Sequence, residues 1–254
     1  MNKYFKAEKV TDNITRIIDL GKVYMYLVEG KERALLIDTG MGCGNLHEYI
    51  QTLTDLPVTV FLTHGHLDHA GGLEGFDDIW LNEADWEMER TNSIQSRYEY
   101  VLGNLEPGVT VEESEFEEAY QGKMNNLKDG KTFDLGGITV KALALPGHTP
   151  GMMTALIEPQ RILLAGDGLN SLGFLFFGYT TIREYRDVLK DFRKYEDCYD
   201  EIWYSHIHNH GGKEILEETI ALCDKVIAGE DDQIEVDFGW NIPTRLAKKI
   251  NKQS

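Results

Sequence analysis

The sequence lacks the features of disulfide-stabilised, secreted and membrane-spanning proteins. Only three of its 254 residues are cysteines, and no two of them form a CxxC pair. A disulfide framework is therefore not expected, and a reducing compartment suits the composition. The first residues contain no apolar run of the kind that a signal peptide needs, and no uninterrupted apolar stretch has transmembrane length. We therefore expect a soluble, cytoplasmic protein.

Basic residues are also scarce. The chain has 25 Lys and Arg residues against 43 Asp and Glu residues, which gives a formal net charge of −18. Binding to nucleic acid depends largely on Lys and Arg residues that release counterions from phosphates, and anionic membrane surfaces attract the same residues. The composition therefore predicts no nucleic acid and no membrane as partner. It favours a small-molecule substrate, with a homodimer as a possible assembly.

The sequence does contain enough apolar residues for a sizeable core. Hydrophobic residues make up 42% of the chain, and its length suits one large domain, which we expect to span residues 1–254. Strand and helix patterns both occur, which indicates the α/β class. Residues 83–128 are expected to form a helical insertion or lid, and residues 241–254 a loosely held tail.

Seven of the eight histidines lie in three short segments. These read THGHLDH at 63–69, PGHTPG at 146–151 and SHIHNH at 205–210. Each segment follows an apolar run that predicts a strand, and so does the aspartate of AGDG at 165–168. The loops at strand ends lie together at one edge of an α/β sheet. Four such junctions with metal-binding side chains therefore predict one shared site.

Imidazole and carboxylate ligands without thiolate suit Zn²⁺, with Fe and Mn as alternatives. A metal site explains this cluster better than structural histidines do, because buried unpaired imidazoles are costly. The ligands are too many for one tetrahedral ion, so we expect two divalent ions. The expected ligands are His64, His66 and His148 for the first ion, Asp68, His69 and His206 for the second, and Asp167 as a bridge. Whether His206 or His208 is the last ligand stays open at this point.

Each ion would keep an open coordination position, which is typical of catalytic sites. Two neighbouring divalent ions lower the pKa of a shared water, so a bridging hydroxide nucleophile exists at neutral pH. Asp68 would also be a catalytic residue, because its carboxylate could orient that hydroxide and pass a proton to the leaving group.

These segments resemble the metal motifs of the metallo-β-lactamase fold superfamily, in order and spacing, from Ala34 to about Ile227. The segment ALLIDTG at 34–40 resembles the early IDTG segment of that family, which implies that Asp38 supports the metal loop by hydrogen bonding. The resemblance also implies an α/β fold with four layers, an αβ/βα sandwich of two mixed β-sheets with helices outside. The ligand set, which contains Asp68 and Asp167 and no cysteine, resembles that of the glyoxalase II and lactonase-like branch more than that of true β-lactamases.

The function that we expect is therefore hydrolysis of a small, partly apolar ester, thioester or lactone. Three alternatives stay open. One is a mononuclear non-haem iron oxygenase that acts on a persulfide and would use His64, His148 and Asp167. Another is a phosphodiesterase or nuclease on the same fold, and the third is a non-catalytic binding or sensor protein.

Substrate binding is expected in the apolar loop SLGFLFFGY at 171–179, which follows Asp167 closely. Apolar walls with few polar groups are typical of small-molecule sites, which favours Phe176 and Phe177 as pocket residues. Tyr179 or His208 could donate a hydrogen bond to a carbonyl or carboxylate group. The alternative for this loop is a place in the core or in a dimer contact. The side chains Trp86, Tyr98 and Tyr100 are expected to cover the site.

Overall fold

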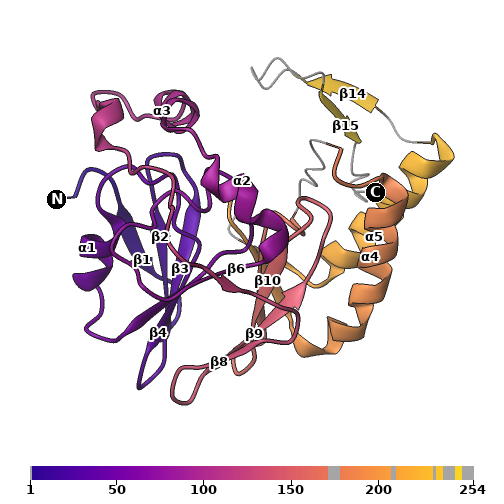
Figure 1. Ribbon diagram of the computed structural model, residues 1–254. Helices are drawn as coiled ribbons and strands as arrows, with labels where there is room; N and C mark the ends of the chain where they lie inside the picture. Colours follow the sequence, from indigo (N-terminus) through magenta and orange to yellow (C-terminus); the bar gives the residue numbers. More distant parts are fainter. Residues whose placement is uncertain (1, 171–177, 207–209, 231–232, 237–243, 248–254) are drawn as a thin grey trace.

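The computed structural model describes residues 2–170, 178–206, 210–230, 233–236 and 244–247, the last two ranges as backbone only. Figure 1 shows two β-sheets packed face to face. The first sheet has seven strands in the order of the sequence. They are β1 (Lys6–Lys9), β2 (Ile14–Ile18), β3 (Tyr24–Glu29), β4 (Ala34–Ile37), β5 (Val58–Phe61), β6 (Ile79–Leu81) and β7 (Asn125–Asn126). The strands from β1 to β4 pair antiparallel, and those from β4 to β7 pair parallel.

The second sheet has six strands in the order β13-β12-β11-β10-β9-β8. They are β8 (Thr132–Asp134), β9 (Thr139–Ala144), β10 (Met153–Ile157), β11 (Ile162–Gly166), β12 (Glu201–Tyr204) and β13 (His210–Gly212). Only β11 and β12 pair parallel; the other pairs are antiparallel. Strands β14 (Gln233–Val236) and β15 (Thr244–Ala247) pair separately, and the rest of the expected tail lies outside the described residues.

The main core lies between the two sheets, because both present apolar side chains to each other. Its members include Ile14, Val28 and Leu35 from the first sheet and Val140, Ala155 and Leu164 from the second. Helix α1 (Leu46–Gln51) packs on the outer face of the first sheet. Helices α4 (Ile182–Phe192) and α5 (Glu214–Ala228) cover the outer face of the second sheet, as Figure 1 shows. The predicted αβ/βα sandwich is thus confirmed.

Local signals define the ends of the outer helices. The Thr181 hydroxyl accepts a hydrogen bond from the backbone N–H of Glu184, and the Glu184 carboxylate accepts one from the backbone N–H of Thr181. This is the capping box that the sequence indicates, and it satisfies backbone donors that the first turn of a helix leaves free. Helix α5 ends at Gly229, whose φ of +71° suits a residue without a Cβ.

The helices of the segment 83–128 lie along the upper edge of the sandwich in Figure 1, and strand β7 near the end of the segment belongs to the first sheet. It contains a 3₁₀ turn at Glu83–Asp85, α2 (Trp86–Arg90), α3 (Ile94–Leu102) and a second 3₁₀ turn at Glu113–Glu115. The helical pattern of the sequence is therefore broken into two short helices. The break has a local cause, because the Ser93 side chain accepts a hydrogen bond from Ser96 N and begins α3. Whether this segment acts as a lid stays a prediction.

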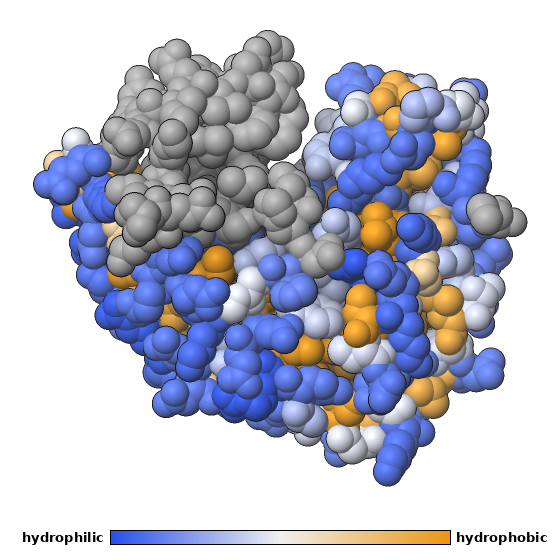
Figure 2. Space-filling model, turned by 180° about the vertical axis from the view of Figure 1, so that it is seen from behind, coloured by the Kyte–Doolittle hydropathy of each residue, from blue (hydrophilic) through white to orange (hydrophobic). Residues whose placement is uncertain are grey.

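The surface agrees with the composition. On the face shown in Figure 2, hydrophilic residues predominate and hydrophobic residues form small separate groups. Within the described ranges, no helix combines the length and the apolar character that crossing a membrane requires.

Candidate metal centre

The candidate ligands meet where strands of both sheets end; they are His64, His66, Asp68, His69, His148, Asp167 and His206. The first histidine segment follows β5, and Asp167 directly follows β11. The second segment connects β9 to β10, and His206 lies two residues beyond the end of β12. The sequence alone therefore predicted correctly that these residues lie together. Their roles as ligands stay a prediction, because proximity does not show a bound ion.

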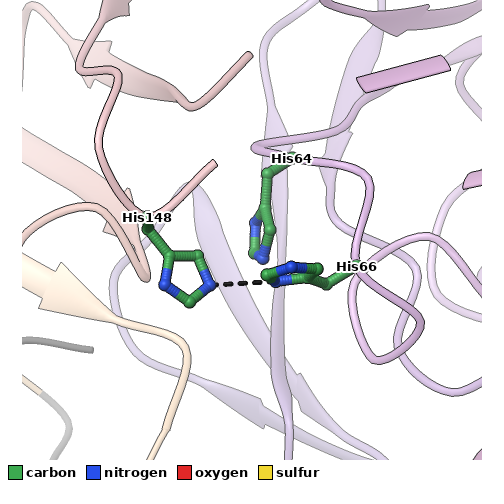
Figure 3. A group of neighbouring side chains, drawn as sticks. All are labelled: His64, His66 and His148. Carbon is green, nitrogen blue, oxygen red and sulfur yellow. Dashed lines mark hydrogen bonds between the residues drawn. The ribbon is translucent and has the colours of Figure 1, made fainter. Parts of the chain in front are cut away.

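The first group of possible ligands consists of His64, His66 and His148. Their ligand atoms lie within 4.8 Å of one another, and His66 Nδ1 is 2.9 Å from His148 Nε2. Figure 3 shows the rings converging from two parts of the chain, His64 and His66 from one loop and His148 from another. The group thus combines ligands from both sheets.

The second group consists of Asp68, His69 and His206, with ligand atoms again within 4.8 Å of one another. His69 Nε2 lies 3.2 Å from His206 Nε2, and Asp68 Oδ2 lies 3.4 Å from His206 Nε2. This geometry places His206 with the candidate ligands. His208 lies outside the described residues, so the choice between these two histidines stays a proposal.

Asp167 lies between the two groups. Its Oδ2 is 3.5 Å from His148 Nε2 and 3.6 Å from His69 Nε2, and its Oδ1 is 3.4 Å from His206 Nε2. Ligands of a tetrahedral zinc ion lie roughly 3.3 Å apart, because each is about 2.0–2.1 Å from the ion. The separations in the cluster therefore suit shared metal coordination, with Asp167 reaching both groups.

Buried polar atoms provide an independent test of this fit. His64 is fully buried, and its Nδ1 lies 3.0 Å from the Thr63 hydroxyl. Among the described residues, His64 Nε2 has no hydrogen-bond partner, although the atom is buried. Such an atom is costly to bury alone, and a cation bound to it would remove that cost. The residues present therefore fit a metal ion.

The two groups differ in electrostatics. Burial and the neighbouring imidazoles lower the pKa of His64 well below its usual value and that of His66 to about 4. Both rings are therefore neutral, which is the form that binds a metal.

In the second group, burial also opposes charge on the imidazoles, but the carboxylates of Asp68 and Asp167 outweigh it. They raise the pKa of His69 and His206. Burial likewise opposes ionisation of Asp68 and Asp167, and the imidazoles of His69 and His206 lower the pKa of both carboxyl groups nonetheless. This group therefore resembles a compact cluster of ion pairs.

Asp38 connects the end of β4 to the metal loop. Its Oδ1 accepts a hydrogen bond from Thr63 N at 2.7 Å, and its Oδ2 accepts one from the Thr63 hydroxyl at 2.8 Å. The same Oδ2 lies 2.8 Å from His69 Nδ1, which leaves His69 Nε2 directed at the second group. These are contacts of the kind that the resemblance implied. Asp38 itself has a φ of +62°, an uncommon conformation for a non-glycine residue.

Sequence reasoning missed three buried charged residues around the metal loop, namely Asp19, Asp85 and Arg97. Asp19 accepts hydrogen bonds from Met41 N at 2.7 Å and Val23 N at 3.0 Å. The Arg97 guanidinium donates to Met41 O at 3.0 Å and to Gly71 O. None of the three belongs to a histidine motif. The only local signal was the position of Asp19 after a strand.

The residues expected to bind substrate are placed only in part. Tyr179 is described and 45% exposed, whereas Phe176, Phe177 and His208 lie outside the described residues. Among the expected covering aromatics, Trp86 packs instead against the core of the first sheet.

Tyr100 lies closer to the candidate ligands. Burial raises its pKa, and the carboxylates of Asp68 and Asp167 raise it further, so the phenol lies within electrostatic reach of both groups. Tyr100 also packs against the same apolar cluster as Leu67, the residue between His66 and Asp68. Helix α3 thus brings an aromatic surface to the metal loop.

Comparison with known proteins agrees with this geometry. The family model of the metallo-beta-lactamase superfamily matches residues 18–209. The human acyl-coenzyme A thioesterase MBLAC2 is 29% identical over 160 residues, which cover 56% of this chain and 57% of the human protein. The atrochrysone carboxyl ACP thioesterase of Aspergillus fumigatus is 27% identical over 179 residues, which cover 69% of this chain and 47% of the fungal protein. The chain thus spans about half the length of these curated relatives.

Solved structures show the same fold at low identity. A metallo-beta-lactamase from Pontibacter korlensis superposes with a TM-score of 0.61 at 19% identity, over 87% of this chain and 99% of that one. At this identity the likeness concerns the fold alone.

Proposed function

Because the chain belongs to the metallo-beta-lactamase superfamily, we propose that it is a metal-dependent hydrolase of a small, partly apolar thioester or ester. The observation that carries this proposal is the pair of adjoining ligand groups, which Asp167 connects. Two relatives are named as thioesterases, and this supports a thioester as the first substrate class to test.

The first ion would be held by His64, His66 and His148, and the second by Asp68, His69 and His206, with Asp167 shared. Zn²⁺ is the ion that we propose first, with Fe and Mn as alternatives, because the donor set is imidazole and carboxylate. When bound, two divalent ions would supply Lewis acidity and a nucleophilic water at neutral pH.

Asp68 would transfer a proton to the leaving group of the substrate. Its carboxylate is mostly buried, and the imidazoles of His69 and His206 keep its pKa low. An ionised carboxylate at this place can accept a proton at Oδ2 and deliver it to a leaving group. That oxygen lies 3.4 Å from His206 Nε2 and 3.7 Å from His69 Nε2.

The substrate would be bound by an apolar surface with few polar groups. Leu67 and Tyr100 supply part of such a surface beside the metal loop. We propose that the acyl part lies there and against Phe176 and Phe177, and that Tyr179 or His208 donates a hydrogen bond. The net charge of −18 favours a substrate without several phosphate groups.

The test is a panel of thioesters, esters, lactones, β-lactams and phosphodiesters, assayed with metal-loaded protein. We expect turnover of thioesters or esters, loss of turnover after chelation, and recovery after Zn²⁺ is restored. A protein with one iron ion per chain that releases sulfite from a persulfide would instead be an oxygenase. Phosphodiester turnover alone would also contradict the proposal.

The ligand assignment has its own test. His206→Ala should reduce the metal content from two ions to one for each chain, whereas His208→Ala should leave two. Elemental analysis after Zn²⁺ loading measures both. The opposite pattern would assign the last ligand to His208.

A further inference from the structure

Asp85 lies in the segment 83–128, which carries no metal-binding motif, yet its carboxylate joins two loops from different sheets. Its Oδ2 accepts hydrogen bonds from the Thr149 hydroxyl at 2.6 Å and from Gly65 N at 3.2 Å. Its Oδ1 accepts a hydrogen bond from Gly151 N at 2.8 Å. The residue is completely buried, so these three donors are its immediate polar surroundings.

The positions of the three donors are informative. Gly65 lies between His64 and His66, and Thr149 and Gly151 follow His148 closely. We propose that Asp85 is a positioning residue that locks the loop of His64 and His66 against the loop of His148. The three imidazoles are thereby preorganised for the first ion. This inference rests on the proposed metal-dependent function.

The ordinary role of an aspartate at this place would be to cap a helix. Asp85 directly precedes α2, and an aspartate there usually accepts a hydrogen bond from a backbone N–H of the first turn. The Asp85 side chain makes no such bond. In the described part of the chain, no Lys, Arg or His forms an ion pair with Asp85 either. Its carboxylate therefore serves the two histidine loops and not its own helix.

The glycines of the two motifs make this contact possible. A Cβ at Gly151 would lie 2.7 Å from Asp85 Cγ, and a Cβ at Gly65 would lie 2.6 Å from the Asp85 carbonyl oxygen. Both distances are too short for real side chains, so only glycine allows Asp85 to approach both loops. Gly65 and Gly151 are therefore required by the close approach of Asp85, which the spacing of the histidines does not reveal.

The expected effect is on metal affinity. The two loops belong to different sheets, so nothing in either loop alone determines how far His148 lies from His64 and His66. Loss of a residue that orients metal ligands typically weakens binding by about 10–100-fold. The first ion should be affected more than the second, because Asp85 makes no hydrogen bond to Asp68, His69 or His206.

The experiment compares Asp85→Asn with wild-type protein and with Asp77→Asn. The Asp85→Asn variant keeps the volume but replaces one acceptor oxygen with an NH₂ group. Asp77 is exposed and only eight residues away, so its variant controls for the same change of charge. Zn²⁺ dissociation constants are measured by competition with a chromophoric chelator. They are also measured in a His206→Ala background, where only the first group is complete. Thermal unfolding of the metal-free proteins is measured in parallel.

We expect Asp85→Asn to weaken binding of the first ion by about 10–100-fold. Asp77→Asn should leave the affinity for that ion unchanged. Thr149→Val removes the 2.6 Å hydrogen bond to Asp85 and should weaken binding of the same ion by a smaller factor. If Asp85→Asn does not fold, Thr149→Val carries the test. The effects of the two substitutions should not add, because they remove the same contact.

An Asp85→Asn protein that is less stable but binds Zn²⁺ with wild-type affinity would overturn the proposal, since Asp85 would then be structural only. The readout does not depend on turnover. Wild-type protein that binds both ions and hydrolyses nothing in the panel would contradict the proposed function and leave the role of Asp85 intact.

Discussion

The two halves of the molecule deliver their candidate ligands in different ways. The first half supplies four of them from one loop of six residues, His64–His69, which follows β5. The second half supplies His148, Asp167 and His206, each from a separate loop at the end of a strand. A loop that carries several ligands must have its shape imposed by contacts, whereas a ligand beside a strand takes its place from the sheet.

The contacts show this difference. In the first half, the loop forms one turn, in which His69 N and Ala70 N both donate to His66 O at 3.0 Å, and buried side chains hold that turn from outside. In the second half, β11 and β12 pair in parallel with Gly166 opposite Tyr204. Asp167 and His206 therefore start from neighbouring strand ends. We infer that side-chain substitutions should disturb the first half more than the second.

Removal of the Asp38 carboxylate should destabilise the first half of the molecule more than any of the following substitutions. Asp38→Ala leaves Thr63 and His69 without a buried acceptor, and removal of one partner from such a pair costs about 3–5 kcal/mol. We expect the free energy of unfolding of the metal-free protein to fall by about that amount, as urea denaturation measures it. The second ion should also bind more weakly. Asp38→Asn is the control, because asparagine tolerates the positive φ better than alanine does. A loss below about 1 kcal/mol would contradict this role.

Asp68 and Asp167 provide a comparison of carboxylates from the two halves. Asp68→Asn should lower kcat by about 10²-fold or more, the scale of lost acid–base catalysis, while the first ion stays bound. Asp167→Asn should weaken binding of both ions. Asp167 lies 3.5 Å from His148 of the first group and 3.6 Å from His69 of the second. Steady-state kinetics and elemental analysis of the same preparations separate the two effects. An Asp68→Asn enzyme with nearly normal turnover would refute the role of Asp68.

Glu89 is a buried residue of α2 whose contribution to stability depends on pH. Burial raises its pKa to about 7 from the ordinary 4.5, although its Oε1 accepts a hydrogen bond from Tyr120 N at 3.1 Å. The folded state therefore binds this proton more tightly than the unfolded state does. The stabilising contribution is complete below pH 4.5 and is lost as the pH rises to about 7.

The difference in stability between wild type and Glu89→Gln should change by about 2–3 kcal/mol between pH 5 and pH 8. The glutamine variant should become relatively more stable as the pH rises, because it has no carboxylate to ionise. Urea denaturation of both metal-free proteins across this range measures the difference. Parallel stability curves would show that Glu89 does not titrate in this window.

The smallest effect should come from a contact between the sheets. The Tyr26 hydroxyl, on β3, donates a hydrogen bond to Tyr204 O at 2.6 Å, two residues before His206. Tyr26→Phe should cost about 0.5–1.5 kcal/mol, the usual contribution of one hydrogen bond. The backbone hydrogen bond from Tyr24 N to Ser205 O, at 2.9 Å, remains. Metal titration should therefore show that the second ion stays bound. Loss of the second ion would mean that the position of His206 beyond β12 also depends on the Tyr26 side chain.

Several features could be predicted because their signals are local. The capping box at Thr181 is contained in four consecutive residues. The candidate metal-binding segments can be identified from their histidines and aspartates, which directly follow apolar strands. The helical pattern from Glu83 to Tyr100 was less informative. The sequence did not show that it would break at Ser93, nor that Trp86 would pack into the core. The packing of Trp86 depends on partners that lie far away in the sequence.

By itself the sequence determined the α/β class, the strand ends that carry histidines and aspartates, and a composition suited to binding metal ions. These follow from periodicity and from residue chemistry, which act over a few neighbouring residues. Only the tertiary structure decided which residues hold the two halves together. Asp85, for example, meets Thr149 across 64 positions of sequence and joins loops on different sheets. Such contacts exist only after the sheets have packed, because the distance between loops on different sheets is a property of the packed core and not of either loop.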